Sequence, residues 1–181
     1  MNPKISIVVP NHNYSRFLPE AINSIVSQGI KDIEIIIVDD FSNDNSDVVI
    51  KELTKKFARD YNLWYINLQS NIGTAATCNI GMNKTSGDYL LILSADDKLA
   101  EGSLRGMSDI LDNNPDVDIV YGDADIYVDG QLVLHIGQVS DENIINLFLY
   151  PEGSLIESTN KESRCTHEIL VPRIFQSKDV T

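Results

Sequence analysis

Hydrophobic residues follow two alternating spacings over the first 135 residues. Short unbroken apolar runs, typical of strands buried on both faces, alternate with segments whose apolar residues recur three and four positions apart, as on one face of a helix. The apolar runs predict strands over residues 4–9, 33–38, 64–68, 89–93, 119–121, 126–128 and 132–135. The helical spacing predicts helices over residues 17–28, 47–61, 74–83 and 103–113.

The alternation of strands and helices predicts an α/β fold. Right-handed crossovers join successive parallel strands, so we expect a mostly parallel, Rossmann-like sheet with helices on both faces. Asp129-Gly130 is a turn signal between two predicted strands and adds a small antiparallel hairpin. We assign residues 1–135 to the core and 136–181 to a partial segment of the same domain. The weaker elements predicted in that segment are a helix over 144–150, a polar loop over 152–164 and a strand over 169–171.

The charge of the chain excludes several classes of partner. Fourteen basic residues stand against 27 acidic ones, a formal net charge of -13. Nucleic-acid-binding proteins and proteins that dock on anionic lipid present basic surfaces, so neither partner fits. No apolar run approaches the length of a membrane span, no secretory leader is recognisable, and two cysteines suit a reducing compartment. The sequence therefore predicts a cytoplasmic protein without a transmembrane segment.

Polar residues gather where the predicted strands end. The segments concerned are Pro10-Asn11-His12-Asn13, Asp39-Asp40 and Ser94-Ala95-Asp96-Asp97. In an open α/β sheet, ligands bind outside the carboxyl ends of the strands. Turn formation alone would explain any one of these loops, because Asn, Asp and Ser are turn residues. Carboxylate pairs after two separate buried strands favour a binding site.

The carboxylate pairs suggest different roles. Mn²⁺ and Mg²⁺ prefer oxygen ligands, so Asp96 and Asp97 could hold such an ion between the acidic chain and a diphosphate. Asp39 or Asp40 could accept a hydrogen bond from a nucleotide base or a ribose hydroxyl. The loop after the first strand contains no glycine, which disfavours a dinucleotide-binding enzyme or a P-loop protein.

Five segments of the chain, taken in order, form a recognisable set. They are Ile5-Ser6-Ile7-Val8-Val9-Pro10-Asn11-His12-Asn13, Glu34-Ile35-Ile36-Ile37-Val38-Asp39-Asp40-Phe41-Ser42, Asn71-Ile72-Gly73, Asn79-Ile80-Gly81 and Gly87-Asp88-Tyr89-Leu90-Leu91-Ile92-Leu93-Ser94-Ala95-Asp96-Asp97. Together they resemble the family-two glycosyltransferases, which are inverting enzymes of the GT-A fold. Each segment is a weak signal, but five in the right order are a strong one. The resemblance covers about residues 3 to 130.

The resemblance implies a nucleotide-sugar donor, such as a UDP- or dTDP-sugar, and a glycan or lipid-linked acceptor in surface polysaccharide synthesis. The implied nucleotide-binding residues are Pro10, Asn11, Asn13, Asp39, Asp40, Gly73, Asn79 and Asp96. Asp96 and Asp97 are the implied ligands of Mn²⁺ or Mg²⁺, and which of them is the main ligand stays open. With a lipid-linked acceptor, the protein would also be located at the inner face of the membrane.

The chain departs from the family pattern at three places. Ser94 stands where the family often has an aspartate, and Cys78 stands where it often has a basic residue. An inverting transferase also needs a carboxylate that deprotonates the acceptor hydroxyl. The resemblance places this base after a strand that matches residues 168–173, so we expect it beyond Thr181, with the catalytic residue unknown.

Two other functions remain as alternatives. A non-catalytic nucleotide-sugar-binding module, paired with a partner that supplies the base, would share the same motifs. A nucleotidyltransferase would need a glycine-rich loop and a basic residue after the first strand, and the chain has neither there. An incomplete domain would expose apolar surface, so a homodimer is a further hypothesis.

Several conspicuous residues have simpler explanations. Asp123-Ala124-Asp125 suits a turn at a strand end, with contact to the donor sugar or the acceptor as the alternative. His12, His135 and His167 lack zinc-ligand spacing, although His12 could pack on the base. We expect Trp64 and the neighbouring Tyr65 in the core and Cys78 as a small helix residue.

Overall fold

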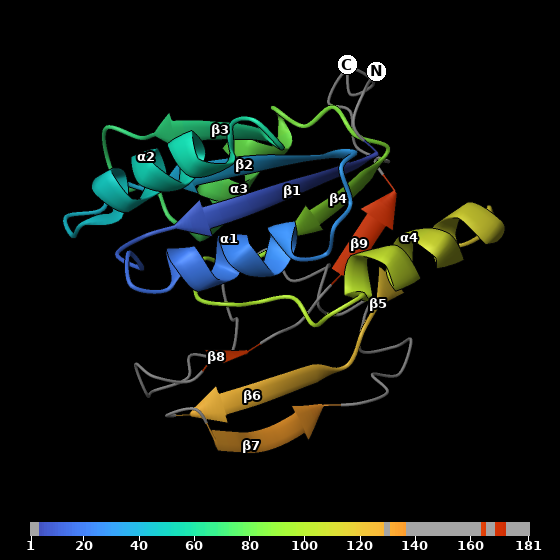
Figure 1. Ribbon diagram of the computed structural model, residues 1–181. Helices are drawn as coiled ribbons and strands as arrows, with labels where there is room; N and C mark the ends of the chain where they lie inside the picture. Colours follow the sequence, from blue (N-terminus) through green and yellow to red (C-terminus); the bar gives the residue numbers. More distant parts are fainter. Residues whose placement is uncertain (1–3, 129–130, 137–163, 166–168, 173–181) are drawn as a thin grey trace. The chain divides into compact units, whose positions relative to one another are not determined.

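The computed structural model describes residues 4–128, 131–136, 164–165 and 169–172 (Figure 1). The helices are α1 (Leu18–Val26), α2 (Ser46–Phe57), α3 (Thr74–Met82) and α4 (Ser103–Asn113). The strands are β1 (Ile5–Asn11), β2 (Ile33–Asp39), β3 (Asn62–Asn67), β4 (Tyr89–Ile92), β5 (Val120–Tyr121), β6 (Ala124–Val128), β7 (Gln131–Ile136), β8 (Arg164–Cys165) and β9 (Ile169–Pro172). They fall into two compact units, with β6, β7 and β8 in the second.

The larger unit is built on a six-stranded sheet of order β3-β2-β1-β4-β9-β5. β1 pairs in parallel with β2 and β4, and β2 pairs in parallel with β3. β9 runs antiparallel between β4 and β5. The predicted α/β class with a mostly parallel sheet is confirmed. The position of β9 was not predicted, because a short apolar run does not reveal its pairing partner.

Helices cover both faces of this sheet, as the alternating pattern predicts. Apolar residues of α1, α2 and α4 share one core with the buried residues of β1 and β2. α3 packs on the opposite face, behind the strands in Figure 1. At Gly81 of α3, a Cβ atom would lie 2.3 Å from Cγ1 of Val8, so only glycine allows this approach of helix to sheet.

β1 continues through Pro10 to Asn11, whereas the apolar run predicted a strand that ends before the proline. The carbonyl oxygen of Pro10 accepts a hydrogen bond from Ala95 N–H (3.2 Å), so Pro10 faces the β4 side of the strand. The β1–β4 pairing ends at Val8 and Ile92, so the missing N–H of Pro10 removes no bond from that ladder.

The expectation that Trp64 belongs to the core is wrong. Its strand, β3, is an edge strand of the six-stranded sheet, and Trp64 is 55% exposed. Its neighbours Leu63 and Tyr65 point to the other face and pack against the core. Alternation along an edge strand therefore decides which aromatic residue is buried. A boundary also differs: α2 ends at Phe57, while the helical spacing predicted Tyr61.

The amino ends of the strands hold a closed polar cluster. Oε1 of Glu34, a residue only 2% exposed, accepts hydrogen bonds from Ser6 Oγ (2.6 Å), Ser86 Oγ (2.9 Å) and the Ser86 N–H. Ser6 Oγ in turn accepts one from Gly87 N–H (2.8 Å). The cluster fixes the turn that leads from α3 into β4.

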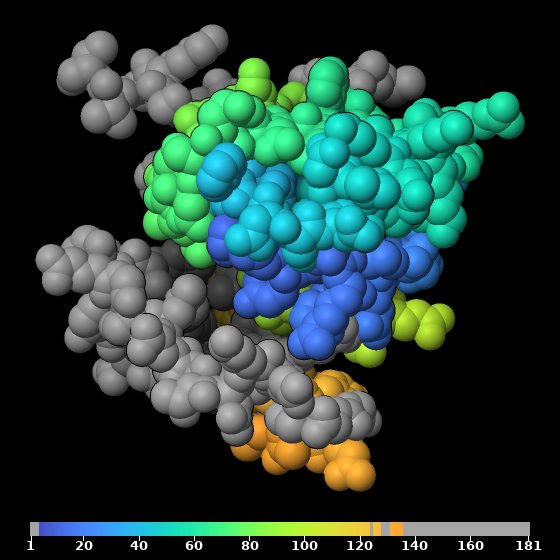
Figure 2. Space-filling view, turned by 90° about the vertical axis from the view of Figure 1, so that its left-hand side faces the viewer, coloured from blue at the N-terminus to red at the C-terminus, as the bar shows by residue number. Residues whose placement is uncertain are grey.

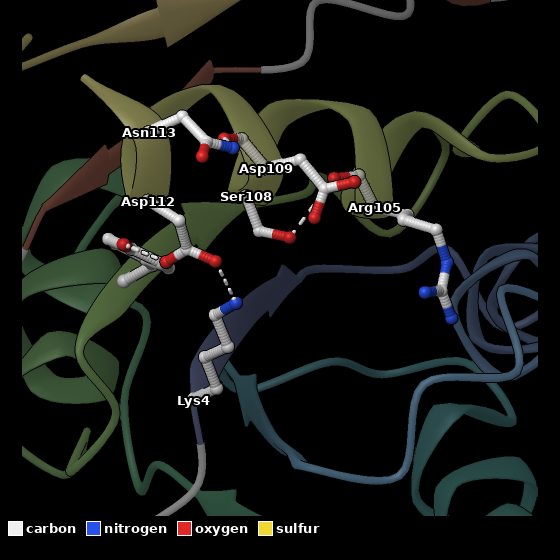
Figure 3. A network of polar contacts seen from close by, with 7 residues as sticks. Lys4, Arg105, Ser108, Asp109, Asp112 and Asn113 are labelled. Carbon is white, nitrogen blue, oxygen red and sulfur yellow. Dashed lines mark hydrogen bonds and ion pairs between the residues drawn. The ribbon is translucent and has the colours of Figure 1, made fainter.

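A second, exposed network lies at the same end of the sheet. The Lys4 ammonium pairs with the Asp112 carboxylate of α4, as Figure 3 shows. The Tyr89 hydroxyl donates to the other carboxylate oxygen (2.6 Å). The Lys4 hydrogen bond lowers the pKa of Asp112, while burial and the neighbouring Asp112 carboxylate raise the pKa of Tyr89 to about 12.

The smaller unit contains a three-stranded sheet of order β7-β6-β8. The predicted antiparallel pairing of β6 with β7 is confirmed. Arg164 lies in β8, although it was predicted to end a loop. A hydrogen bond to Asp125 (2.7 Å) raises the pKa of His135. The Asp129-Gly130 turn, the helix over 144–150 and His167 lie outside the described residues.

Candidate functional site at the carboxyl ends of the strands

The loops after β1, β2 and β3 are linked by hydrogen bonds at the carboxyl edge of the sheet. Figure 2 views this edge, where the blue, light-blue and green surfaces of the three loops adjoin. Asn13 N–H donates to Ser42 Oγ (2.8 Å), and Asn43 N–H donates to Asn13 Oδ1 (2.8 Å). Asn13 adopts a positive φ of 61°, which turns the chain after β1 toward the loop of β2.

Asp39 and Asn11 form the buried layer of this edge, each only 2% exposed. Oδ1 of Asp39 accepts from Asn11 Nδ2 and from Ser42 Oγ (2.6 Å), and Oδ2 accepts from Ser42 N–H (3.0 Å). Asn11 Nδ2 also donates to Ser46 Oγ (2.9 Å) at the start of α2. Both residues therefore hold the loop that leads from β2 to α2.

Asp40 links the loop after β2 to the loop after β3. Asp40 is only 3% exposed, and its two carboxylate oxygens accept hydrogen bonds from Ile72 N–H (2.7 Å) and Gly73 N–H (2.9 Å). Gly73 has a φ of 83° and precedes the first residue of α3. The Asp40 carboxylate thus fixes the start of α3 through two backbone groups.

His12 lies among these loops with an exposed side chain. Because Asn13 Oδ1 accepts from Asn43, the Nδ2 of the same amide faces His12 Nε2 (3.0 Å). An amide nitrogen only donates, so Nε2 accepts and the ring proton lies on Nδ1, which donates to the Asp40 carbonyl (2.7 Å). Asn71 Nδ2 lies 3.3 Å from both ring nitrogens. The ring therefore bridges all three loops.

Asp96 and Asp97 lie half-buried in the turn that follows β4. Asp97 N–H donates to the Ser94 carbonyl (3.0 Å), and Ala95 N–H joins this turn to Pro10. Tyr14, in the loop after β1, interacts electrostatically with Asp96 and Asp97. Burial raises the pKa of Tyr14, and the Asp96 charge raises it further, so the phenol stays protonated at neutral pH.

The donor chemistry of this turn fits a Mg²⁺ or Mn²⁺ ion. Mg²⁺ in particular is usually held by one or two protein carboxylates, with phosphate and water oxygens completing the shell. Asp96 and Asp97 supply two adjacent carboxylates that solvent can reach. Within the described part of the chain, no group of three or more His, Cys, Asp or Glu residues is arranged to hold a metal. Such an ion would therefore depend on ligand oxygens.

Two residues named from the sequence lie on or beside α3. Gly73 belongs to the linked loops, whereas Asn79 is exposed in the second half of the helix. Among the described residues, no hydrogen bond joins the Asn79 side chain to the loops after β1 and β2. Cys78 is a free thiol whose pKa is raised by burial, as suits a small helix residue rather than a nucleophile.

The sequence missed three features of this edge. Tyr14 gave no signal, because its electrostatic interaction with Asp96 joins loops about 80 positions apart. Asn71 was recognised only as part of a family segment, although its Nδ2 lies 3.3 Å from the His12 ring nitrogens. The burial of Asp39 and Asp40 was also missed, since a strand-end aspartate looks the same in sequence whether it faces solvent or backbone N–H groups.

These features define an α/β domain whose polar residues concentrate where parallel strands end. The family model "Glycosyl transferase family 2" matches residues 6–172, so the chain belongs to the family-2 glycosyltransferases. The resemblance drawn from the sequence is thereby confirmed. In the part of the chain that the structure describes, every helix is too short or too polar to cross a bilayer.

Two bacterial relatives illustrate the similarity. Glycosyltransferase GlyG of Streptococcus pneumoniae is 34% identical over 176 residues, which cover 97% of this chain and 50% of GlyG. The GalNAc(5)-diNAcBac-PP-undecaprenol beta-1,3-glucosyltransferase of Campylobacter jejuni is 36% identical over 102 residues, or 56% of this chain and 32% of that enzyme. The chain thus spans half or less of the length of these relatives.

Solved structures with the same fold include two ligand complexes. The mannosyltransferase PcManGT from Pyrobaculum calidifontis in complex with GDP-Man and Mn²⁺ has a TM-score of 0.60 at 21% identity, covering 66% of this chain and 35% of that one. S. aureus TarS 1-349 in complex with UDP-GlcNAc has a TM-score of 0.57 at 22% identity, covering 72% and 37%. At this identity the likeness concerns the fold, which is the predicted GT-A fold.

Proposed function

We propose that the protein transfers a sugar from a nucleotide diphosphate donor to an acceptor hydroxyl with inversion, and that the linked strand-end loops bind the donor. The observation that carries the proposal is the proximity of these loops to the Asp96–Asp97 turn, which joins β1 through the hydrogen bond from Ala95 N–H to the Pro10 carbonyl. The family membership supports the reaction class. A UDP- or dTDP-sugar is our proposed donor.

The buried and exposed layers of the edge have different parts in this proposal. Asn11, Asp39 and Asp40 keep the loops in place, and the donor lies against the outer groups, such as His12 and Asn13. Asn79 and Gly73 would border the donor from α3. A bound Mn²⁺ or Mg²⁺ ion would neutralise the diphosphate leaving group. Asp96 and Asp97 would hold that ion.

The acceptor is proposed to be a glycan or a lipid-linked glycan of the cell surface, used on the cytoplasmic side of the membrane. The Campylobacter relative is named for an undecaprenol-linked acceptor, which supports this class. The TarS and PcManGT complexes hold a UDP-sugar and a GDP-sugar, which supports a nucleotide-sugar donor without selecting the base. The carboxylate base is proposed to lie beyond Thr181.

The test is calorimetric titration of the protein with UDP and with dTDP, each with and without Mn²⁺. We expect metal-dependent binding that falls at least about tenfold, or 1.4 kcal/mol, in the double variant Asp96→Ala/Asp97→Ala. The matched control is Asp109→Ala/Asp116→Ala, which removes two exposed carboxylates elsewhere and should bind as the parent does. Absence of any metal-dependent binding by the parent protein would refute the proposed donor site.

Sugar transfer separates the enzyme from its closest alternative. A non-catalytic binding module would bind the same nucleotides with the same metal dependence. It would release no UDP from a UDP-sugar when offered acceptor glycans, whereas the proposed enzyme would when it is assayed together with the segment beyond Thr181 that is proposed to carry the base. Transfer of a nucleotidyl group from a triphosphate would instead indicate a nucleotidyltransferase.

A further inference from the structure

The loop after β2 carries an aromatic residue in an unfavourable backbone conformation. Among the residues that the structure describes, Asn13 and Phe41 are the non-glycine residues with a positive φ, 61° and 58° respectively. Asparagine adopts this left-handed conformation readily, because its short side chain hydrogen-bonds locally, whereas a bulky aromatic residue rarely does. Glycine would adopt it without strain. The phenylalanine at position 41 therefore costs stability.

The residues on either side of Phe41 impose this conformation. Before it, the Asp40 carbonyl accepts a hydrogen bond from His12 Nδ1 (2.7 Å). After it, Ser42 Oγ accepts one from Asn13 N–H (2.8 Å). Both bonds join the loop after β2 to the loop after β1, so Phe41 lies where these two loops meet.

Packing within the protein does not explain the aromatic ring. Phe41 is 55% exposed, and within the described residues it is absent from the core of the larger unit. The loops after β1 and β3 each expose a large apolar residue as well, Tyr14 and Ile72. Ile72 N–H donates to the Asp40 carboxylate (2.7 Å), which ties its loop to the residue before Phe41. Strained residues that the surrounding structure holds in place cluster at ligand-binding sites.

We propose that the Phe41 ring is a contact surface for the base of the donor nucleotide. This inference rests on the proposed function, because it requires the donor to lie against the strand-end loops. His12 and Asn13, the outer groups proposed to face the donor, are also the groups that hold the residues flanking Phe41. Every nucleobase has a flat π face that stacks on an aromatic ring, so the contact contributes affinity without selecting the base.

The experiment measures Mn²⁺-dependent binding of UDP and dTDP by calorimetry for the parent protein and for Phe41→Ala, Phe41→Gly and Phe41→Tyr. Loss of a stacking partner typically costs about tenfold in affinity, so we expect this loss in Phe41→Ala and Phe41→Gly for each nucleotide that the parent binds. Phe41→Tyr keeps the ring and should bind within about twofold of the parent. Phe41→Gly should melt no lower than the parent, because glycine relieves the strain.

Trp64→Ala is the matched control for the loss of an exposed aromatic residue. Trp64 is as exposed as Phe41, but it lies within β3 and outside the linked loops. This variant should bind both nucleotides as the parent protein does. An equal loss of affinity in Trp64→Ala would contradict a specific contact at Phe41.

The other outcomes overturn the inference in distinguishable ways. If Phe41→Ala and Phe41→Gly bind as the parent does, the ring does not contact the nucleotide, while the proposed function stands. If only Phe41→Gly loses affinity, the rigidity of the loop matters and the ring does not. If Phe41→Tyr loses as much as Phe41→Ala, or if Phe41→Gly melts lower than the parent, the ring has a structural role instead. If the parent protein shows no Mn²⁺-dependent nucleotide binding, the proposed donor site is wrong and the role of Phe41 fails with it.

Discussion

The two ends of the six-stranded sheet both bury carboxylates, and they differ in what those carboxylates hold. At the amino end, Glu34 receives hydrogen bonds from Ser6 and Ser86, which fixes one turn of the fold. At the carboxyl end, Asp39 and Asp40 hold loops whose outer side chains remain exposed. Burial of a carboxylate therefore does not identify a binding residue. The groups above the buried layer are the candidates for ligand contact.

This comparison has a physical basis in the direction of the strands. The loops at the carboxyl ends of parallel strands leave the sheet side by side, so polar groups from different loops meet there. At the amino end, Gly87 comes so close to Ser6 that a side chain would not fit. One end is thus closed by packing, while the other presents several loops to solvent. The predictions below test whether changes at the amino end affect stability alone, and whether changes at the carboxyl end affect both stability and binding.

Glu34→Ala should give the largest loss of stability. The change removes the acceptor of Ser6 Oγ, Ser86 Oγ and Ser86 N–H, and Ser6 is fully buried. Unsatisfied buried donors cost about 1–3 kcal/mol each, so we expect the free energy of unfolding to fall by about 3 kcal/mol in urea titrations. UDP affinity of the folded fraction should stay as in the parent protein. A loss of affinity would mean that the amino end also shapes the site.

Gly87→Ala should destabilise the protein by about 2 kcal/mol, again without effect on UDP affinity. A Cβ atom there would lie 2.7 Å from Ser6 Oγ and 2.9 Å from Ser6 N, and the backbone atom cannot move away cheaply. Gly106→Ala in α4 is the control, because its added Cβ would meet nothing within 4 Å. The two variants are compared by the midpoint temperatures of their thermal unfolding. Equal midpoints would show that the structure around Gly87 accommodates the added Cβ atom without loss of stability.

Asp40→Ala should change stability and binding together. Loss of the acceptor for Ile72 N–H and Gly73 N–H should lower the free energy of unfolding by about 1.5 kcal/mol, because these groups are only partly buried and water can replace part of the bond. Release of the loop after β3 should also weaken Mn²⁺-dependent UDP binding by roughly tenfold. Calorimetry on the folded variant measures this. Unchanged UDP affinity would contradict the view that the carboxyl end of the sheet, unlike the amino end, shapes the binding site.

Lys4→Met should have the smallest effect, below about 1 kcal/mol, because its ion pair with Asp112 is exposed. The Lys4 hydrogen bond lowers the folded-state pKa of Asp112, so the stabilisation is present above the unfolded-state pKa of about 3.9 and is lost as the pH falls through the folded-state pKa. The difference in melting temperature between parent and variant should therefore be visible at pH 7 and shrink in acid. A difference independent of pH would assign the effect to packing.

Much of the fold could be predicted because periodicity reports burial directly. The apolar runs of β1 and β2 are continuous because both faces of these central strands are covered, and their predicted ranges hold within about two residues. Trp64 and Tyr65 could not be assigned in the same way. On an edge strand only one face is packed, and the sequence does not say which.

The candidate site likewise has one part that the sequence predicts and one part that it does not. The strand-end positions of Asp39, Asp40, Asp96 and Asp97 follow from local patterning, since a parallel strand delivers its last residues to a known edge. Their roles do not follow, because the partners of each carboxylate come from other loops. An aspartate holds a loop when backbone N–H groups lie within about 3 Å of its carboxylate oxygens, as they do at Asp39 and Asp40. The sequence does not show which backbone groups lie there.

The sequence by itself determined the class of the fold, the edge that carries the polar loops and the family to which the chain belongs. These properties depend on spacing and residue type, which are local or ordered along the chain. The tertiary structure alone decided that Asp40 holds the start of α3 and that His12 bridges three loops. Each of these contacts joins residues from separate loops, and only the packing of helices and strands brings such residues together.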